Sequence, residues 1–181
     1  MKTHSSSLDR TSMLITAGVA VLAVYMIYKA TIAYRHSEGS GLELIYTSLL
    51  GILPLVLIIA TYLYRTTAIT IDNTGIIVER NISPVAINYS DITSVMPLTK
   101  ADMGLVARTF GNGGLFGYTG MFYNKKYGSM KWYCTNRSNY VLIEKANGKK
   151  AVISPDEPGE FIKDIKEASP SLKIIYPQSG G

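Results

Sequence analysis

The stretch Leu44–Tyr64 (LIYTSLLGILPLVLIIATYLY) decides where the rest of the chain sits. Its 21 residues carry no charge. As a helix rising about 1.5 Å per residue they reach about 30 Å, the thickness of the hydrocarbon core of a bilayer. Glu43 and Arg65 flank the stretch, and tyrosines lie near both ends, where amphipathic rings prefer the lipid headgroups. A buried helix of a soluble protein is the alternative, but such helices seldom run this long without a charge. The stretch therefore predicts a membrane-spanning helix.

A second apolar run, Met13–Tyr28, precedes this stretch and extends to Tyr34 if the Lys29 side chain reaches the membrane surface. With basic residues ahead of it, the run has features of a signal peptide. However, Lys29 stands where a cleavage site should form, and a full second span follows within a few residues. A second membrane helix is therefore the better interpretation.

Together the two runs predict a two-helix transmembrane hairpin over residues 13–64, with helices at about 13–34 and 44–64. The polar segment Arg35–Leu42 forms the predicted turn between them. Residues 1–12 are polar and predict a loose N-terminal tail. Because a hairpin returns the chain to the side where it started, the tail and the C-terminal part share one side of the membrane.

The distribution of basic residues indicates which side this is. Four basic residues lie on the side of the chain ends and two near the turn: Lys2, Arg10, Arg65 and Arg80 against Lys29 and Arg35. This excess favours a cytoplasmic soluble part under the positive-inside rule. The single cysteine, Cys134, excludes an internal disulfide and fits a reducing compartment. From Arg65 onward there are 14 Lys and Arg against 10 Asp and Glu. This small, scattered excess argues against a nucleic-acid partner.

From Thr67 the pattern changes to short β-branched runs separated by turn residues. The turn sequence Asp72-Asn73-Thr74-Gly75 joins the first two runs, and Asn147-Gly148 is the strongest hairpin signal in the chain. Seven short strands are predicted: Thr67–Ile71, Ile76–Glu79, Pro84–Tyr89, Ile92–Leu98, Met130–Thr135, Tyr140–Lys145 and Lys150–Ser154.

An amphipathic helix is predicted after these strands, starting within Ser154–Pro158, with Ser154 or Asp156 as its cap. Its inner face holds Phe161, Ile162, Ile165 and Ala168, and its outer face Lys163, Asp164, Lys166 and Glu167. A small antiparallel barrel with this helix packed across one open end buries both apolar surfaces. We place this mainly-β domain at residues 66–169 and a C-terminal extension at 170–181.

Three segments resemble a known family: Ile69–Val78 (ITIDNTGIIV), Ile87–Val95 (INYSDITSV) and Ile153–Ile162 (ISPDEPGEFI). Together with the preceding hairpin they resemble the bacterial pleckstrin-homology-like (PH-like) domains of small membrane proteins, over about residues 67–168. The resemblance implies a PH-like fold on a two-span integral protein of the bacterial cell membrane. In better-known PH domains, phosphoinositides bind where the first hairpin turn is rich in Lys and Arg. Here that turn, Asp72–Gly75, has no basic residue, which argues against transferring lipid-phosphate binding to this chain.

Catalytic chemistry finds little support in the sequence. The two histidines, His4 and His36, lie in the predicted tail and turn, so the domain lacks a Cys/His or Ser/His pairing. The glycine-rich segment 111–117 (GNGGLFG) has neither the third glycine of a dinucleotide site nor a Walker lysine. No His/Cys cluster has metal-ligand spacing. We therefore predict no catalytic residue, no metal site and no cofactor.

The segment Thr99–Ser129 is a long excursion without clear periodicity, and such loops are commonly functional or disordered. Its centre, Arg108–Tyr127 (RTFGNGGLFGYTGMFYNKKY), interleaves glycines with six aromatic residues, which makes disorder a poor explanation. Candidate binding residues are Arg108, Phe110, Asn112, Phe116, Tyr118, Phe122, Tyr123, Lys125, Lys126, Tyr127 and Lys131.

Three interpretations of this loop stay open at the level of sequence. Its aromatic rings pack back onto the barrel, or form an exposed patch for a protein partner, or dip with the lysines into the membrane interface. We predict a loop that is ordered against the domain, with part of its aromatic surface available to a partner.

The function predicted from these features is a membrane-anchored PH-like binding module without catalytic activity. Its partners are the lipid bilayer and either another protein or a second copy of the chain. The alternative is an accessory subunit of a membrane transport or secretion assembly, with the hairpin as the working part. The predicted spans carry no charge apart from Lys29 near one end, so they give no sign of an ion path.

Overall fold

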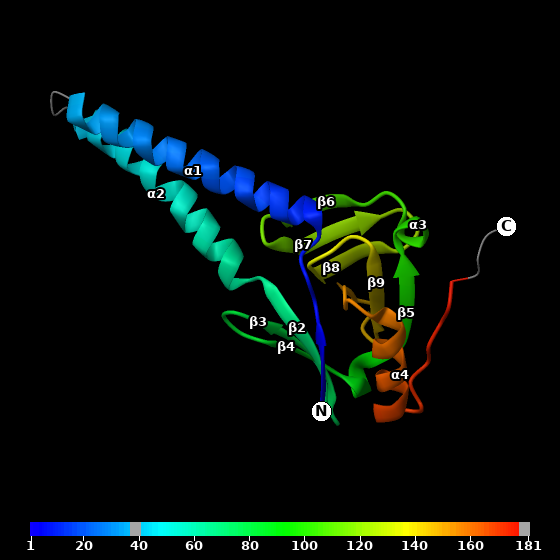
Figure 1. Ribbon diagram of the computed structural model, residues 1–181. Helices are drawn as coiled ribbons and strands as arrows, with labels where there is room; N and C mark the ends of the chain where they lie inside the picture. Colours follow the sequence, from blue (N-terminus) through cyan, green and yellow to red (C-terminus); the bar gives the residue numbers. More distant parts are fainter. Residues whose placement is uncertain (37–40, 178–181) are drawn as a thin grey trace.

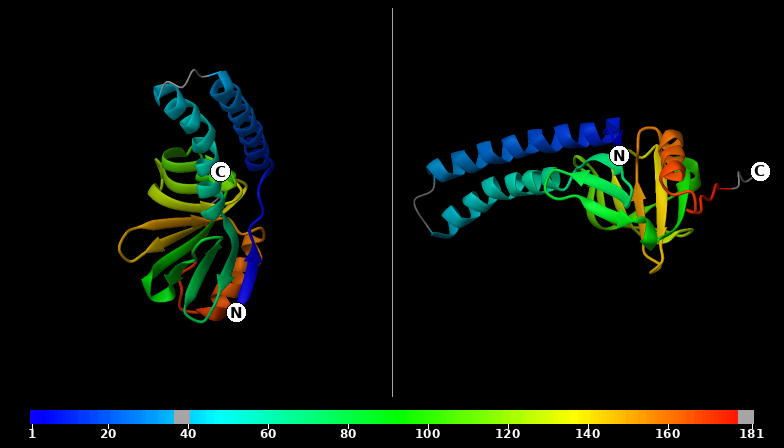
Figure 2. Two further views of the ribbon diagram at one scale, coloured as in Figure 1. Left: turned by 90° about the vertical axis from the view of Figure 1, so that its left-hand side faces the viewer. Right: turned by 90° about the horizontal axis from the view of Figure 1, so that it is seen from below.

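The computed structural model describes residues 1–36 and 41–177, so residues 37–40 of the predicted turn and the predicted frayed end 178–181 lie outside the described residues. Two long helices, α1 (Arg10–His36) and α2 (Gly41–Leu63), run side by side and project from one end of a β-rich domain (Figures 1 and 2). The prediction of two apolar helices ahead of a mainly-β domain with a C-terminal helix is confirmed.

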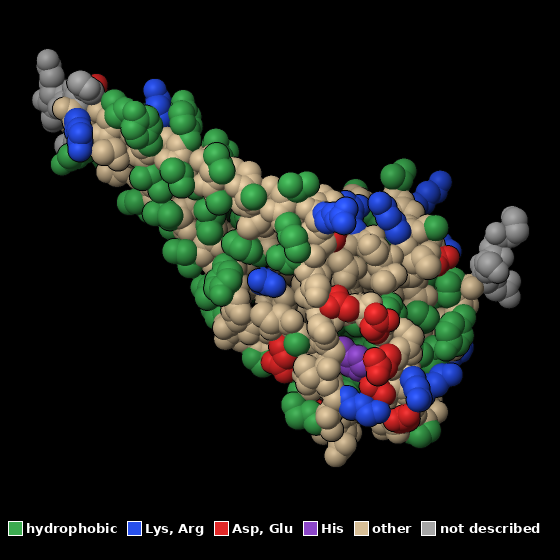
Figure 3. Space-filling view, in the orientation of Figure 1, with side chains coloured by type: hydrophobic (Ala, Val, Ile, Leu, Met, Phe, Trp, Pro, Cys, Tyr) green, Lys and Arg blue, Asp and Glu red, His purple; other side chains and the backbone are tan. Residues whose placement is uncertain are grey.

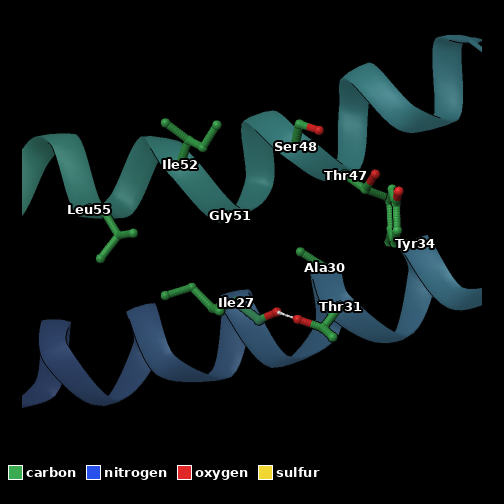
Figure 4. Close-up of a pocket in the computed structure, with 9 residues that line it drawn as sticks. All are labelled: Ile27, Ala30, Thr31, Tyr34, Thr47, Ser48, Gly51, Ile52 and Leu55. Atoms are coloured by element: carbon green, nitrogen blue, oxygen red, sulfur yellow. Dashed lines mark hydrogen bonds between the residues drawn. The ribbon is translucent and has the colours of Figure 1, made fainter.

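Both helices are long and apolar enough to cross a membrane. Many of their large apolar side chains are exposed, and Figure 3 shows hydrophobic side chains along the whole hairpin. The helices approach closely at Gly51, where an added Cβ would lie 3.7 Å from the Cβ of Ala30. A shallow groove of about 380 Å³ opens between them (Figure 4). It is lined by Ile27, Ala30, Thr31, Tyr34, Thr47, Ser48, Gly51, Ile52 and Leu55.

The first sheet has four antiparallel strands in the order β1-β2-β3-β4. Their bounds are Lys2–Ser5, Thr66–Ile71, Gly75–Arg80 and Val85–Asn88. The predicted turn between β2 and β3 is confirmed: the Asp72 carboxylate accepts hydrogen bonds from the N–H groups of Thr74 and Gly75 at 2.7 and 2.8 Å. These bonds lower the pKa of Asp72, the hydroxyl of Thr74 contributing most.

The second sheet has six strands in the order β5-β9-β10-β8-β7-β6. Their bounds in chain order are Ile92–Thr99, Ala107–Gly114, Gly117–Asn124, Gly128–Cys134, Asn139–Lys145 and Lys150–Ile153. A 3₁₀ turn (Tyr89–Asp91) and the short helix α3 (Lys100–Met103) flank β5, and α4 (Pro158–Ala168) follows β10. The prediction of seven antiparallel strands is corrected on two points. The described residues form ten strands, and β8 pairs with β10 in parallel.

Two apolar clusters lie on opposite faces of the six-stranded sheet. The first draws buried residues from both sheets and α4, with Ile69, Ile143 and Phe161 fully enclosed. The second lies on the other face, around Trp132, and joins Leu98 of β5 to Phe122 of β7. Because β5 and β7 are far apart in the strand order, the sheet must curl around this second cluster.

The N-terminal residues are not a loose tail, and this prediction is wrong. Strand β1 pairs with β2, and residues 2–9 run across the domain as a strap (Figure 1). Lys2 Nζ lies 2.6 Å from Asp164 Oδ1, which lowers the pKa of that carboxyl. The buried ring of His4 packs edge-on against Phe161, and its Nε2 lies 3.1 Å from Asp164 Oδ2. The sequence missed the strap because it is polar, and its partner strand lies more than sixty residues away.

The strap also changes the roles predicted for α4. Asp164, predicted on the outer face, is buried beneath Lys2 and His4, whereas Ala168, predicted on the inner face, is exposed. Asp156 does not cap the helix; it accepts hydrogen bonds from the N–H and hydroxyl of Ser7 at 2.8 and 2.7 Å. Ser154 does not cap it either, because its hydroxyl accepts from the Thr135 N–H at 2.8 Å. Asp156 therefore attaches the strap, and Ser154 bonds to the backbone just after β8.

Asp9 links the strap, α1 and the domain. Its Oδ1 accepts the Ser12 N–H at 2.7 Å, the pattern of a helix N-cap. Both carboxylate oxygens lie 3.2 Å from the hydroxyl of Tyr118, and Oδ2 accepts the Arg137 N–H at 3.1 Å. One carboxylate therefore starts α1 and ties it to two places on the domain.

Further contacts extend this junction along both helices. The buried hydroxyl of Ser12 donates to the Gly114 carbonyl at 2.7 Å, and the Phe116 N–H donates to Thr16 Oγ1 at 3.0 Å. At the end of α2, the Asn81 side chain donates to the Tyr62 carbonyl at 2.8 Å. The Ile82 N–H donates to the Leu63 carbonyl at 3.0 Å. The domain is thus attached to the hairpin at two separate points.

Replacing Asp9 tests this junction. We expect Asp9→Ala to lower the free energy of unfolding by about 1–2 kcal/mol, because the helix cap and the partners of Tyr118 and Arg137 are lost together. Asp9→Asn keeps the capping oxygen and should cost clearly less. Thermal denaturation of the full chain in detergent measures the difference. Equal melting temperatures for Asp9→Ala and the unaltered chain would show that this carboxylate does not hold the junction.

Candidate functional site

The predicted loop Thr99–Ser129 is not a loop. It contains α3, the hairpin β6–β7 and the start of β8. The sequence of β6 and β7 does not show the usual alternation of apolar and polar residues, because glycines occupy the positions where the two strands come close. Gly111 and Gly120 pair across the hairpin with φ of 106° and 133°, and a Cβ on Gly120 would lie 2.3 Å from the Phe110 carbonyl oxygen. Only glycine accommodates both that approach and that backbone.

The tip of this hairpin lies against the ends of the apolar helices. The Asn112 side chain accepts the Leu115 N–H at 3.0 Å and donates to the carbonyls of Leu115 and Gly117. Phe116 adopts φ 56°, and its ring packs edge-on against Tyr62 of α2 with centroids 5.5 Å apart. Asn112 and Phe116 therefore shape the tip and its contact with the hairpin.

The aromatic residues of the site divide into two groups. Tyr118 and Phe122 are 2% and 5% exposed, and Tyr127 is also buried in the second cluster. Phe122 stacks on Trp132 at 4.4 Å between ring centroids. Burial and the nearby Asp9 carboxylate raise the pKa of Tyr118 to about 12. In contrast, Phe110 is 77% and Tyr123 49% exposed.

The exposed aromatic residues lie on a part of the six-stranded sheet that no described segment of the chain covers. One cross-strand row runs Phe110–Met121–Lys131–Ala151–Ile143–Val95. Its last three members are buried in the first cluster, under the four-stranded sheet and α4. Its first three members lie on β6, β7 and β8, beyond that cover. We call this uncovered surface the open face; its side chains are Phe110, Met121, Tyr123, Ser129 and Lys131.

A lysine-rich hollow of about 540 Å³ lies at the border of the open face. Its lining comes from β7, β8, the end of β9, the β9–β10 turn and β10. The residues are Met121, Ser129, Lys131, Tyr133, Lys145, Gly148, Lys149, Lys150 and Ala151. We call it the lysine hollow. Of its four lysines, sequence reasoning named only Lys131. The other three lysines flank the Asn147-Gly148 hairpin turn, and this clustering around a predicted turn is the signal in the sequence that could have indicated a binding site.

The remaining predicted basic residues do not gather with these lysines. The Arg108 guanidinium folds over the backbone of its own strand near Gly113. A Cβ added at Gly113 would lie 2.7 Å from Arg108 Nη1. Lys125 and Lys126 are exposed in the turn between β7 and β8, and Lys126 Nζ lies 5.2 Å from the ring centroid of Tyr127. The predicted site thus separates into a tip, an open face and a hollow.

Cys134 and His4, the two side chains best suited to nucleophilic or acid–base chemistry in the domain, are enclosed. Cys134 is fully buried, and burial raises the pKa of its thiol. His4 lies in the domain rather than in a tail, where it contacts Asp164 and Phe161. Across the described ranges 1–36 and 41–177, no group of three or more His, Cys, Asp or Glu side chains is arranged to hold a metal ion. These groups therefore form structural contacts.

Comparison with known proteins identifies the domain. A family model described as bacterial PH domain matches residues 67–169, more than half of the 181 residues. The chain belongs to the bacterial PH domain family. Neither the curated proteins nor the solved structures contain a match.

The matched region of the PH domain runs from β2 to the end of α4 and includes the open face and the lysine hollow. The strap and the two apolar helices precede it. PH domains are generally non-catalytic interaction modules. The first hairpin turn of this PH domain carries no basic residue, and its Asp72 carboxylate binds the turn itself.

The division of the aromatic residues predicts two kinds of mutant. We expect Tyr118→Ala and Phe122→Ala to destabilise the full chain by about 3–5 kcal/mol, because each removes a buried ring. Phe110→Ala and Tyr123→Ala should stay within about 0.5 kcal/mol of the unaltered chain. Thermal denaturation in detergent separates the two groups. Comparable destabilisation by all four would mean that the open face is covered in solution.

Proposed function

We propose that this chain is a membrane-anchored PH domain protein that binds a protein partner on its open face and performs no catalysis. The observation that carries the proposal is the uncovered half of the six-stranded sheet, where Phe110 and Tyr123 are exposed beside Met121 and Lys131. Aromatic, methionine and arginine side chains are the types enriched at the centres of protein interfaces. Large rings also supply contact area at a small cost in conformational entropy.

The two apolar helices cross the membrane in this proposal. Apolar side chains such as Leu14, Val21 and Leu53 are exposed along their lengths, and water disfavours an apolar surface of this extent. A bilayer removes that cost for both helices together. The contacts of Asp9 and Asn81 then hold the PH domain next to the membrane, with the open face in a fixed orientation.

We expect the PH domain to lie on the cytoplasmic side, from the excess of basic residues at the chain ends. Cys134 is enclosed and does not report sidedness, so a cysteine is introduced at exposed Lys163 of α4. An impermeant thiol reagent should leave Lys163→Cys unlabelled in intact cells and label it after the membrane is opened. The unaltered chain, unlabelled in both states, is the control. Prompt labelling in intact cells would place the domain outside.

Partner binding is tested by crosslinking in native membranes. The variant Phe110→Ala/Tyr123→Ala should lose most of the crosslinked species formed by the unaltered chain, because the apolar contacts at the centre of an interface contribute most of its affinity. Tyr176→Ala is the matched control, since this ring is also exposed but lies in the C-terminal segment. Equal crosslinking by the double variant and the control, at equal expression, would remove the open face as the partner site.

A further inference from the structure

The lysine hollow concentrates positive charge that the chain itself does not neutralise. Four lysines line it, Lys131, Lys145, Lys149 and Lys150, and the first three lie on the face of the sheet that carries Ala151. The one carboxylate paired with any of them is that of Glu144, 3.5 Å from Lys150 Nζ. In the part of the chain that the structure describes, the other three form no ion pair. Like charges around one concave site repel each other and attract an anion.

The hollow is built on fixed backbone. Lys131 lies in the middle of β8, paired with Met121 of β7 and with Ala151 of β10, and both partners also line the hollow. Lys150 is positioned by donating to the Tyr127 carbonyl at 3.0 Å.

Lys145 ends β9, and Lys149 lies in the turn between β9 and β10. Gly148 has φ 75° and donates its N–H to the Lys145 carbonyl, while the Lys149 N–H donates to Asn147 Oδ1. The lysine side chains therefore start from defined backbone positions on β8, β9, β10 and the β9–β10 turn.

We propose that the lysine hollow binds a phosphate-bearing ligand with at least two negative charges. Lysine is a compact point charge that suits phosphate oxygens, whereas planar carboxylates favour arginine, which is absent from the lining. A volume of about 540 Å³ lies in the usual range for small-molecule sites. Met121 and Tyr133 supply apolar wall for the uncharged part of the ligand.

This site differs from the first hairpin turn, Asp72–Gly75, which contributes nothing to the lining. It borders the proposed protein interface and shares Met121, Ser129 and Lys131 with it, whereas Phe110 and Tyr123 do not line it. A phosphate group of this kind is found on a lipid headgroup or on a soluble compound. Both sources offer the same chemistry to the four lysines, and the experiment distinguishes them.

The test uses the full chain and reads the lysines directly. An amine-reactive reagent is applied in limiting amount, and mass spectrometry follows the modification rate of each lysine. One arm compares detergent-solubilised protein with and without sodium pyrophosphate at matched ionic strength. The other compares nanodiscs of phosphatidylcholine with nanodiscs that also contain phosphatidic acid. Lys100 and Lys163, which are exposed elsewhere on the domain, are internal controls.

We expect the hollow lysines to be protected in at least one arm while Lys100 and Lys163 keep their rates. Protection by pyrophosphate indicates a soluble phosphate ligand, and protection only by phosphatidic acid indicates a headgroup. No protection in either arm, or equal protection of the control lysines, overturns the proposal.

A pair of variants adds an affinity measurement with the ligand that protects. Lys131→Gln/Lys149→Gln should bind it about tenfold or more weakly, because each charge-assisted hydrogen bond contributes roughly that factor. Lys100→Gln/Lys163→Gln has the same net charge and should bind like the unaltered chain. Both pairs replace exposed lysines, and their melting temperatures verify folding. Equal weakening by both pairs would mean attraction to net charge alone and would overturn the site.

Discussion

The carboxylate of Asp9 is the contact on which the arrangement of this protein depends. It caps α1 through the Ser12 N–H and binds the domain through the Tyr118 hydroxyl and the Arg137 N–H. A helix start normally leaves several N–H groups without partners, and here the residue that satisfies one of them also bonds to the sheet. The contacts of this one carboxylate therefore fix the orientation of the apolar hairpin relative to the PH domain. The second attachment, at Asn81 and Ile82, restricts rotation about the first.

This attachment explains why the β6–β7 hairpin is present. Its tip gives Gly114 and Phe116 to α1 and α2, so the strands must extend beyond the part of the sheet that the four-stranded sheet and α4 cover. The extension buries one face around Trp132 and leaves the other uncovered. The open face is thus a geometric consequence of reaching the helices, and the aromatic and lysine side chains on it are the features available for binding.

Local patterns predicted much of this fold from sequence. The apolar helices, the Asp72–Gly75 and Asn147-Gly148 turns and α4 were found because their signals lie within a few residues of each other. Strand β1 was missed because Lys2–Ser5 is short and polar, and its pairing with β2 is settled only by folding. The burial of Asp164 was missed for the same reason, since Lys2 and His4 of the strap contact its carboxylate.

The composition of the candidate site is visible in the sequence, but its arrangement depends on strand pairings between distant segments. The glycines of the segment Arg108–Tyr127 conceal its strand pattern in the sequence, whereas in the fold Gly111 and Gly120 allow two strands to approach. Sequence gave no means to separate the buried Tyr118 from the exposed Phe110, because strand register decides which face each residue takes. The lysines of the hollow come from separate strands and a turn, and the parallel pairing of β8 with β10 brings Lys131 beside Ala151, close to that turn.

The central claim, that the PH domain is held rigidly on the apolar hairpin, is tested most directly by a distance measurement. Spin labels are attached to cysteines introduced at exposed Tyr28 of α1 and exposed Lys163 of α4, in nanodiscs, with the enclosed Cys134 left in place. Pulsed electron–electron double resonance then reports the distribution of distances between the two spin labels. A single narrow distribution is expected, broadening when Asp9 and Ser12 are both replaced by alanine. A broad distribution in the otherwise unaltered chain would contradict the claim, because the domain would then move freely on its helices.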